Sequence, residues 1–312
     1  MYMTAKFQRD GTRDGTPSFD PMRPHVRYKL RRRDGVFQHH SISASAIMLS
    51  AFFLASLSLA LPALGQATCT RDFLKAATAE YLDALTAGEP TFSTLSSDVD
   101  YYENDALVNI TTGVLSQGVK INFNLSIYDT TQCASYTEIV ATEGHPYVIG
   151  TRLAFTDNKA THIDSIVCDT GDWLFNATGS LIYNRQENWD PIPIEKRESR
   201  TALKAAGDAY IDAWGNHTVK PVFAKNCARL EGGFYITSSC LLNFPPPFNV
   251  SNQRYTIDEE LGAVDIFHLF PFLDAAIPRH PGTQTNNLIR VESGEIRYIH
   301  ENTVCSTRNC GR

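Results

Sequence analysis

The sequence predicts an α+β protein that contains two tandem copies of one fold. The segment 74–84 returns at 203–213, an offset of 129 positions, with seven of its eleven residues identical and an eighth exchanging Leu for Ile. The ends of the two halves are also alike, because 163–168 and 299–305 each begin with Ile and close with Val-Cys. Solenoid repeats span about 20 to 50 residues, so this offset has the size of a small domain.

Residues 73–87 are predicted to form an amphipathic helix, because apolar side chains recur there at three- and four-residue intervals. Asp72 is the expected N-cap, and Gly88 stands where the helix should end. A turn or short helix is expected at 91–95. The β-type segments that follow are 99–103, 118–128, 135–141, 148–156 and 161–168.

The second half predicts the same order of elements. A helix is expected at 199–214, after an aromatic bridge at 172–189 and an extended Pro-Ile-Pro linker at 191–193. The strands expected after it are 233–238, 253–258, 262–270, 288–292 and 296–301. Each half is therefore predicted to be a helix followed by an antiparallel sheet, which buries a core and leaves a pocket at its open end.

The chain before the first helix is predicted to lie outside the folded part. Residues 1–47 carry nine Lys/Arg against four Asp/Glu, and they are expected to be a non-folded extension or the product of a mis-assigned start codon. Residues 48–67 are predicted to be a secretory signal peptide. The alternative is a retained signal anchor, although its apolar core at 47–61 is shorter than the roughly 20 residues of a membrane span. The two domains are then expected at 68–190 and 199–312.

Charge and cysteine content describe the mature protein. The whole chain has a net charge of −6 and residues 48–312 alone carry −11, which argues against nucleic acid as a partner. All seven cysteines follow the expected cleavage point and none forms a CxxC pair, so up to three disulfides of open connectivity are expected. The expected location is the secretory pathway, with a secreted or vesicular product. Five N-linked glycosylation sites are predicted, at Asn109, Asn124, Asn176, Asn216 and Asn249.

The order of the first helix, Gly-Glu-Pro at 88–90 and the segment 98–104 resembles a cone fold. This is the nuclear-transport-factor-like or SnoaL-like fold of ketosteroid isomerases, scytalone dehydratases and small polyketide cyclases. The segment 223–233 gives the second half a similar resemblance. The resemblance implies two tandem cones, each a helix on a curved antiparallel sheet whose concave face lines a pocket. The fold alone does not imply an activity.

A closer resemblance covers most of residues 69–305. A secreted fungal family is similar in the strings at 133–138, 145–151, 163–167, 171–177 and 258–265. Its characterised members are hetero-Diels–Alderases, which join a tropolone- or phenol-derived o-quinone methide to a humulene-type sesquiterpene alcohol in meroterpenoid biosynthesis. The resemblance implies this pericyclase activity, with small hydrophobic molecules as partners and with no cofactor and no metal. A homodimer is compatible with it.

Such a reaction needs a dry pocket that holds both reactants in register. It also needs an acid that expels water from a hydroxymethyl precursor, and hydrogen-bond donors to the quinone-methide oxygen. The sequence leaves two other functions open: a polyketide dehydratase or cyclase of the same fold, and a secreted glycoprotein that binds a hydrophobic ligand without catalysis. Strands that carry paired His and Asp favour chemistry over binding alone.

Catalytic groups are expected on the last strand of each half. His162 and Asp164 share one face of a strand, as do Tyr298 and His300 in the equivalent strand. An exposed strand face or a cross-strand partner is the alternative for each. The residues expected to bind substrate are Trp173, Tyr102, Tyr147, Phe267 and His268. Three adjacent carboxylates at 258–260 suggest calcium, but their alternation across a strand is better explained by a solvated edge.

Overall fold

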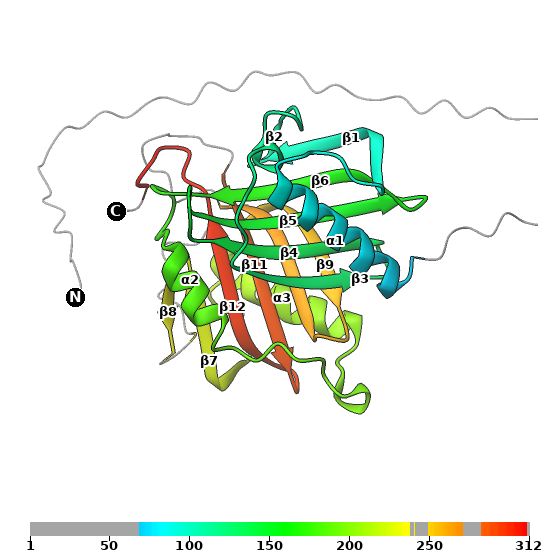
Figure 1. Cartoon of the computed structure of the whole chain (residues 1–312). Coiled ribbons are helices and arrows are strands. Elements are labelled where there is room, and N and C mark those ends of the chain that lie inside the picture. Colours follow the sequence, from blue (N-terminus) through cyan, green and yellow to red (C-terminus); the bar gives the residue numbers. More distant parts are fainter. Residues whose placement is uncertain (1–68, 238–239, 241–248, 271–281, 311–312) are drawn as a thin grey trace, which may run out of the picture. The chain divides into compact units, whose positions relative to one another are not determined.

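The structure is a computed structural model that describes residues 69–237, 240, 249–270 and 282–310. The extension and the signal peptide predicted at 1–67 lie outside the described residues. The fold class agrees with the prediction. The chain is α+β and has two six-stranded sheets, each preceded by a helix (Figure 1).

The first repeat begins with α1 (Arg71–Ala87). Its other elements are β1 (Leu95–Glu103), β2 (Ala106–Leu107), the 3-10 helix η1 (Val114–Ser116), β3 (Phe123–Asp129), β4 (Ala134–Ala141), β5 (Tyr147–Thr156) and β6 (Lys159–Cys168). The strands are ordered β2-β1-β6-β5-β4-β3 in the sheet. The helix α1 packs across one face of this sheet (Figure 1).

The bridge between the repeats contains α2 (Ala177–Asn184) and η2 (Ile194–Lys196). The second repeat comprises α3 (Arg200–Gly215), β7 (Phe223–Glu231), β8 (Phe234–Ile236), β9 (Ser251–Asp258), β10 (Ala263–Phe270), β11 (Thr283–Glu292) and β12 (Glu295–Thr303). Its strand order, β8-β7-β12-β11-β10-β9, repeats that of the first sheet position by position. The strand β7 is absent from the sequence-based prediction.

The strand directions correct one detail of the prediction. β1 runs parallel to β6, and β7 runs parallel to β12, whereas the other neighbouring strands are antiparallel. A parallel pair needs a long connection, and here the connection is the rest of the repeat, from β2 to β5 or from β8 to β11. Each sheet is therefore mixed, with one parallel pair, rather than wholly antiparallel.

The helix ends are set by local capping. Thr70 caps α1 in place of the expected Asp72, because its side chain accepts the backbone N–H of Phe73 at 3.1 Å. Asp72 lies in the first turn, where its negative charge complements the helix dipole. Gly88 ends the helix as predicted, with φ +70° in the left-handed region that favours glycine. Ser199 caps α3 in the same way that Thr70 caps α1.

The two repeats contact each other through reciprocal ion pairs. Arg71 begins α1, and its Nη1 lies 2.8 Å from Asp258 Oδ1 at the end of β9. Arg200, 129 positions after Arg71, begins α3, and its two Nη atoms each lie 2.7 Å from an oxygen of Asp129 at the end of β3. A contact of residue i with j that is matched by j with i is typical of a two-fold axis. The repeats are therefore related like the subunits of a symmetric dimer.

These pairs also correct the prediction of a solvated edge at one of its three positions, Asp258, whereas Glu259 is exposed as predicted. Asp258 is only 1% exposed, and it accepts the backbone N–H of Tyr128 at 2.9 Å. Asp129 is 0% exposed, and it accepts the backbone N–H of Ile257 at 3.0 Å. A carboxylate is stable in the interior only when it is paired and hydrogen-bonded. Both aspartates are therefore links between the repeats.

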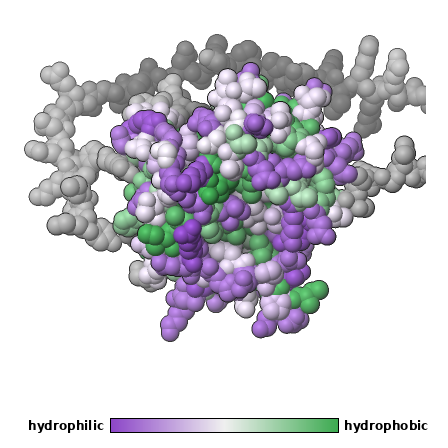
Figure 2. Space-filling model, viewed as in Figure 1, coloured by the Kyte–Doolittle hydropathy of each residue, from purple (hydrophilic) through white to green (hydrophobic). Residues whose placement is uncertain are grey.

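Each sheet is covered on both faces. One face packs on the helix of its own repeat, through Leu74 and Tyr81 of α1 or through Leu203 and Tyr210 of α3. The opposite faces of the two sheets pack on each other, with a shared apolar core that includes Ile127, Tyr136, Ile166, Phe267 and Leu288. On the surface drawn in Figure 2, hydrophobic residues lie in small groups among hydrophilic ones.

Three disulfides form within the described residues: Cys69–Cys133, Cys227–Cys240 and Cys305–Cys310. Cys168 is free and buried. Stable disulfides of this kind form in oxidising compartments, so the protein belongs to an oxidising, extracellular or secretory environment. Among the helices that the structure describes, none is both long and apolar enough to cross a membrane.

Candidate functional site

Three of the predicted site residues, Tyr102, His162 and Asp164, come together in a pocket of ≈ 320 Å³. Residues of both repeats line this inter-repeat pocket: Tyr102, Asp105, His162, Asp164, Asn252 and Arg254. His162 and Asp164 share one face of β6, as strand alternation predicts. That face is turned towards the second repeat, whereas the prediction expected a pocket on the concave face of a single cone.

Arg254 controls the charge of the inter-repeat pocket. Its Nε lies 2.7 Å from Asp164 Oδ2, and its Nη2 lies 2.8 Å from Asp105 Oδ1. Burial raises the pKa of Asp164 although the Arg254 guanidinium opposes the shift. Burial also lowers the pKa of His162, whose ring lies 5.1 Å from that of Tyr102. The pocket therefore holds a neutral imidazole beside carboxylates that are already paired with an arginine.

The other predicted catalytic pair, Tyr298 and His300, is not among the residues that line this pocket. His300 is 1% exposed and lies between two carboxylates, with Nδ1 3.0 Å from Glu138 and Nε2 2.7 Å from Glu187. Burial would lower its pKa, but attraction to Glu187 and Glu138 outweighs burial and raises the pKa to about 10. The imidazole is therefore a permanent cation at neutral pH, and it ties β4, the bridge and β12 together.

The residues predicted to bind substrate are dispersed. Tyr147 donates its hydroxyl to Gln117 at 2.7 Å, on the side of the first sheet that faces α1. Phe267 is fully buried between the sheets, with its ring 6.0 Å from that of Tyr136. Tyr102 alone lies with His162 in the inter-repeat pocket. Of the remaining two, His268 belongs to a second group of residues, and Trp173 donates a hydrogen bond to Glu231 of that group.

This second group lies on the side of the second sheet that faces α3. It consists of polar side chains on four neighbouring strands, here called the interior cluster: Arg229, Glu231, His268, Thr285, Asn287, Glu301 and Thr303. The α3 residue Tyr210, which is fully buried, interacts electrostatically with Arg229 and Glu301. The cluster therefore lies between the second sheet and its helix α3.

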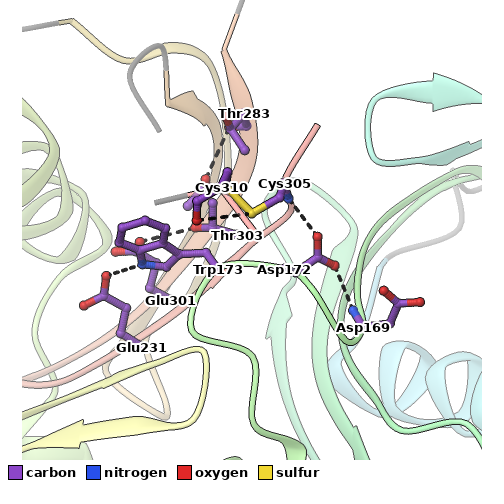
Figure 3. The surroundings of a disulfide bond; sticks show 10 residues. Asp169, Asp172, Trp173, Glu231, Thr283, Glu301, Thr303, Cys305 and Cys310 are labelled. Atoms are coloured by element: carbon purple, nitrogen blue, oxygen red, sulfur yellow. Dashed lines mark hydrogen bonds between the residues drawn. A yellow bond between two sulfur atoms is a disulfide. The ribbon is translucent and has the colours of Figure 1, made fainter. Parts of the chain in front are cut away.

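Glu301 is the centre of the interior cluster. Its Oε2 accepts Asn287 Nδ2 at 3.3 Å, and its Oε1 lies 3.3 Å from Thr303 Oγ1. Thr303 Oγ1 lies 3.1 Å from Thr285 Oγ1. Figure 3 shows Trp173, Glu231, Glu301 and Thr303 grouped beside the Cys305–Cys310 disulfide. The carboxyl group is thus held by hydrogen bonds from two neighbouring strands.

Two ionisable groups of the cluster have pKa values that are shifted in opposite senses. Burial raises the pKa of Glu301, repulsion from Glu231 adds to the rise, and Arg229 opposes it, which leaves a pKa of about 8. Burial lowers the pKa of His268 to about 4. At neutral pH, Glu301 is therefore mainly a protonated acid and His268 a neutral imidazole, and such a separation of pKa values is typical of acid–base sites.

Asn287 connects these two groups. Its Oδ1 lies 2.7 Å from His268 Nε2, while its Nδ2 donates to Glu301. The neutral imidazole must therefore carry its proton on Nε2, because the amide oxygen can only accept a hydrogen bond. This arrangement fixes the orientation of His268, Asn287 and Glu301 along one line across β10, β11 and β12.

The outer part of the cluster is more accessible. The side chains of Arg229 and Glu231 are 15% and 14% exposed, and their ion pair joins Nη2 and Oε2 at 3.1 Å. Trp173, which comes from the bridge before α2, donates its indole N–H to Glu231 Oε1 at 2.7 Å. The indole thereby stands next to Glu231, the acidic partner of the ion pair (Figure 3).

Arg229, Asn287 and Glu301 are absent from the sequence-based prediction of the site. Glu301 is adjacent to His300, and Phe267 is adjacent to His268, so each pair places one residue on each face of a strand. The sequence signal was present, because the pattern Glu301-x-Thr303 puts two polar groups on one face. Within the described residues, no group of three or more His, Cys, Asp or Glu is placed to hold a metal ion.

The comparisons with known proteins concern the second repeat. Residues 196–303 match a family model described as a domain of unknown function, DUF8021. The matched segment begins just before α3 and ends at the last residue of β12, so it contains the whole interior cluster. No curated protein matches the chain.

Proposed function

We propose that this chain is a hetero-Diels–Alderase whose general acid is Glu301. The observation that carries the proposal is a carboxyl group that is 5% exposed, has a pKa of about 8 and lies on the side of the second sheet that faces α3. Such a group retains its proton at neutral pH and can deliver it in a water-poor site. The reactants are those that the resemblance to the fungal family implies: a hydroxymethyl tropolone or phenol and a humulene-type sesquiterpene alcohol.

The first step is the loss of water from the hydroxymethyl precursor. Glu301 protonates the hydroxyl of the hydroxymethyl group, the C–O bond breaks, and water leaves. The resulting Glu301 carboxylate takes the proton of the ring hydroxyl, which gives the neutral o-quinone methide and restores the acid. In the second step, the quinone methide and an alkene of the sesquiterpene form one C–O bond and one C–C bond, and no proton is transferred.

Two neighbours of Glu301 suit this reaction. The Arg229 guanidinium offers N–H donors to the quinone-methide oxygen, on which negative charge grows in the transition state. The indole of Trp173 is fixed by its bond to Glu231 and offers a flat apolar face to an aromatic ring. Positioning of both reactants can supply several kcal/mol of the barrier reduction, because it converts a bimolecular reaction into a unimolecular one.

The inter-repeat pocket suits the same reactants less well. Its two carboxylates, Asp105 and Asp164, are both bonded to Arg254. Its lining residues are Tyr102 and five residues with charged or strongly polar side chains, whereas sites for apolar ligands are lined mainly by apolar side chains. A carboxyl group that is paired with an arginine is favoured in its ionised form, so it is less able to hold a proton for donation than the buried carboxyl of Glu301.

The test uses the purified glycoprotein, a hydroxymethyl-phenol or hydroxymethyl-tropolone precursor and a humulene-type alcohol, with adduct followed by chromatography. Glu301→Gln should slow adduct formation from the hydroxymethyl precursor by about 10²-fold or more. The same variant should retain activity on a quinone methide generated in solution by an independent route. Glu295→Gln, in the exposed part of the same strand, is the control and should match the wild type. A protein that binds both reactants without accelerating either step would be a binding protein.

A second candidate function is a polyketide dehydratase or cyclase of the same fold. The observation that favours it is the line from the neutral imidazole of His268 through Asn287 to Glu301, which offers a base and an acid for proton transfer next to a carbonyl. Incubation of a β-hydroxy ketone in deuterium oxide separates the two functions. Exchange of the α-hydrogen that depends on His268 supports the dehydratase, and its absence supports the cycloaddition.

We further propose that the chain passes through the secretory pathway and is released or stored in vesicles. Three disulfides support this location, and all five sequon asparagines are exposed. Mature protein from a fungal host should begin between Gln66 and Thr70 and should lose mass on deglycosylation. N-terminal sequencing that recovers Met1 would contradict the predicted cleavage.

A further inference from the structure

Two of the predicted glycosylation sites line one pocket. Asn216 directly follows α3 and Asn249 precedes β9, and both contribute to the wall of a pocket of ≈ 310 Å³. Its other lining residues include three aliphatic ones, Ile211, Val219 and Val250. This glycan pocket is separate from the inter-repeat pocket and from the interior cluster, with which it shares no residue.

We propose that this pocket seats the first N-acetylglucosamine of the chain's own N-linked glycan, attached to Asn216. The inference rests on the proposed passage through the secretory pathway, which the disulfides support independently of any glycan. It does not depend on the proposed hetero-Diels–Alderase activity.

The geometry of Asn216 favours it as the attachment site. Its backbone N–H donates to the Asp212 carbonyl at 2.8 Å and so closes the end of α3. Its side-chain oxygen accepts the backbone N–H of Thr218 at 3.1 Å and the Thr218 hydroxyl at 2.7 Å. The amide oxygen is thus held in an Asx turn, and the remaining amide nitrogen is the atom that carries the sugar. A side chain fixed in this way presents the sugar in one direction.

The chemistry of the pocket fits a sugar that carries an acetamido group. Val219 and Val250 provide apolar surface for the C–H face of the ring and for the acetyl methyl group. Asp212 and Gln253 provide an acceptor and a donor for the amide and the hydroxyl groups. Because the sugar is covalently tethered, its effective concentration at the pocket is high, so weak contacts are enough to hold it.

Asn109 offers a matched control. Its side-chain oxygen accepts the Thr111 backbone N–H at 3.0 Å and the Thr111 hydroxyl at 2.8 Å, so it forms the same turn as Asn216. It is also exposed, but it lines neither of the two pockets described above. A glycan on Asn109 therefore has the same chemistry at its attachment but does not adjoin either of these two pockets.

The experiment compares melting temperatures of glycoprotein from a eukaryotic host. Asn216→Gln should lower the melting temperature by about 2–4 °C and should speed hydrogen exchange in residues 211–219, whereas Asn109→Gln should change neither. Trimming with an endoglycosidase that leaves one N-acetylglucosamine should preserve the wild-type melting temperature. Complete removal with an amidase should reproduce the loss seen for Asn216→Gln.

Two results would overturn the proposal. One is a mass spectrum in which Asn216 is unmodified while other sequons carry glycans. The other is a single-sugar form that melts at the same temperature as the fully deglycosylated protein, because the first sugar then makes no stabilising contact. Absence of glycan at all five sequons would contradict the secretory proposal as well, and it would leave the assignment of Glu301 unaffected.

Discussion

The two repeats have the same strand order and register, but their sheets present different side chains to their helices. One row of paired residues across three strands is apolar in the first repeat and polar in the second: Ile139, Ile149 and Val167 against His268, Thr285 and Thr303. The three residues of the first row belong to the apolar core beneath α1. The corresponding row of the second repeat contains no aliphatic side chain.

The neighbouring row of paired residues is neutral in the first repeat and contains an ionisable group in the second. In the first repeat, Thr151 bonds to Tyr81 at 3.0 Å and to Ser165 at 2.9 Å, which forms a neutral hydrogen-bonded group. The strand registers place Asn287 where Thr151 stands and Glu301 where Ser165 stands. The second repeat has thus replaced a hydroxyl with an ionisable carboxyl at the same site.

This difference shows that the fold does not require a polar interior. In the two rows compared, the first repeat has only apolar and neutral side chains, whereas burial of a carboxyl group reduces stability unless it is fully compensated. A departure from good packing that occurs in one copy of a repeated fold and not in the other indicates a role other than folding. The comparison therefore supports the proposal that function lies in the second repeat, with the first as structural support.

The largest effect is expected when Glu301, the ionisable residue that distinguishes the second repeat from the first, is exchanged. Replacement of Glu301 by serine, the residue of the first repeat, should reduce adduct formation by about 10²-fold or more because the general acid is lost. Ser165→Ala should leave the rate unchanged, although it removes a hydrogen bond to Thr151 worth about 1 kcal/mol. Steady-state rates below the melting temperature measure both effects. Equal loss in the two variants would remove the distinction between the repeats.

The second prediction concerns the predicted catalytic residues Asp164 and His300, which occupy equivalent positions in β6 and β12. His300→Gln should destabilise the fold by about 3–5 kcal/mol, since Glu138 and Glu187 would be left buried without their cation. Asp164→Asn should cost less, because Arg254 is part-exposed and keeps its bond to a second aspartate. Urea unfolding gives both values. A His300→Gln variant with unchanged stability and low activity would restore His300 as a catalytic residue.

The fold was predictable from local patterns. Three signals in the sequence were enough to predict the helices: the repeat at 74–84 and 203–213, the amphipathic spacing, and Gly88. Each signal depends on residues that are close in the chain. The parallel pairing of β1 with β6 and the ion pairs between repeats were not predictable. Arg200 finds its partner Asp129 71 residues away, and no local pattern encodes such a distance. The two arginines and the two aspartates of these ion pairs are each 129 residues apart. This equal offset indicates paired contacts only when the two repeats are known to face each other.

The site was only partly predictable, because both faces of each sheet are buried. When one face of a strand is solvated, alternation of polar and apolar residues tells which side is inside. In β12, Glu301 faces α3 and its neighbour His300 faces the other sheet, and both are buried and polar. The prediction of His162 and Asp164 as neighbours needed only the period of a strand. The choice between His300 and Glu301 needed the arrangement of the two sheets, which the sequence does not reveal.

A smaller effect is expected at the reciprocal ion pairs. Arg71→Met and Arg200→Met should each destabilise the fold by about 1–3 kcal/mol, less than removal of a fully buried partner, since these side chains are 20% and 25% exposed. In each variant, the aspartate that has lost its arginine still accepts a backbone N–H group, which limits the loss of stability. The two losses should be similar and additive in the double variant. Clearly unequal losses of stability for the two variants in denaturant unfolding would contradict the two-fold relation between the repeats.

The last prediction concerns the pH dependence of stability that Glu301 confers on the second repeat alone. Its pKa is about 8 in the folded protein and 4.5 in the reference state, so the folded state binds the extra proton between these values. Stability from this group is therefore complete below pH 4.5 and falls as the pH rises towards 8, by at most about 1.4 kcal/mol per pH unit. His300, with a pKa raised from 6.5 to about 10, adds a loss between pH 6.5 and 10. His268, with a pKa lowered from 6.5 to about 4, adds a loss as the pH falls from 6.5 towards 4.

The contribution of Glu301 can be isolated because the two histidines are common to all variants. Denaturant unfolding from pH 5 to 8 should show a steeper decline for the wild type than for Glu301→Gln, whose amide does not titrate. Ser165→Ala should keep the wild-type slope, since no ionisable group stands at that position in the first repeat. If Glu301→Gln and the wild type declined in parallel, Glu301 would be ionised in the folded state at neutral pH. It would then have no proton to give, and the contrast between the repeats would be one of polarity alone.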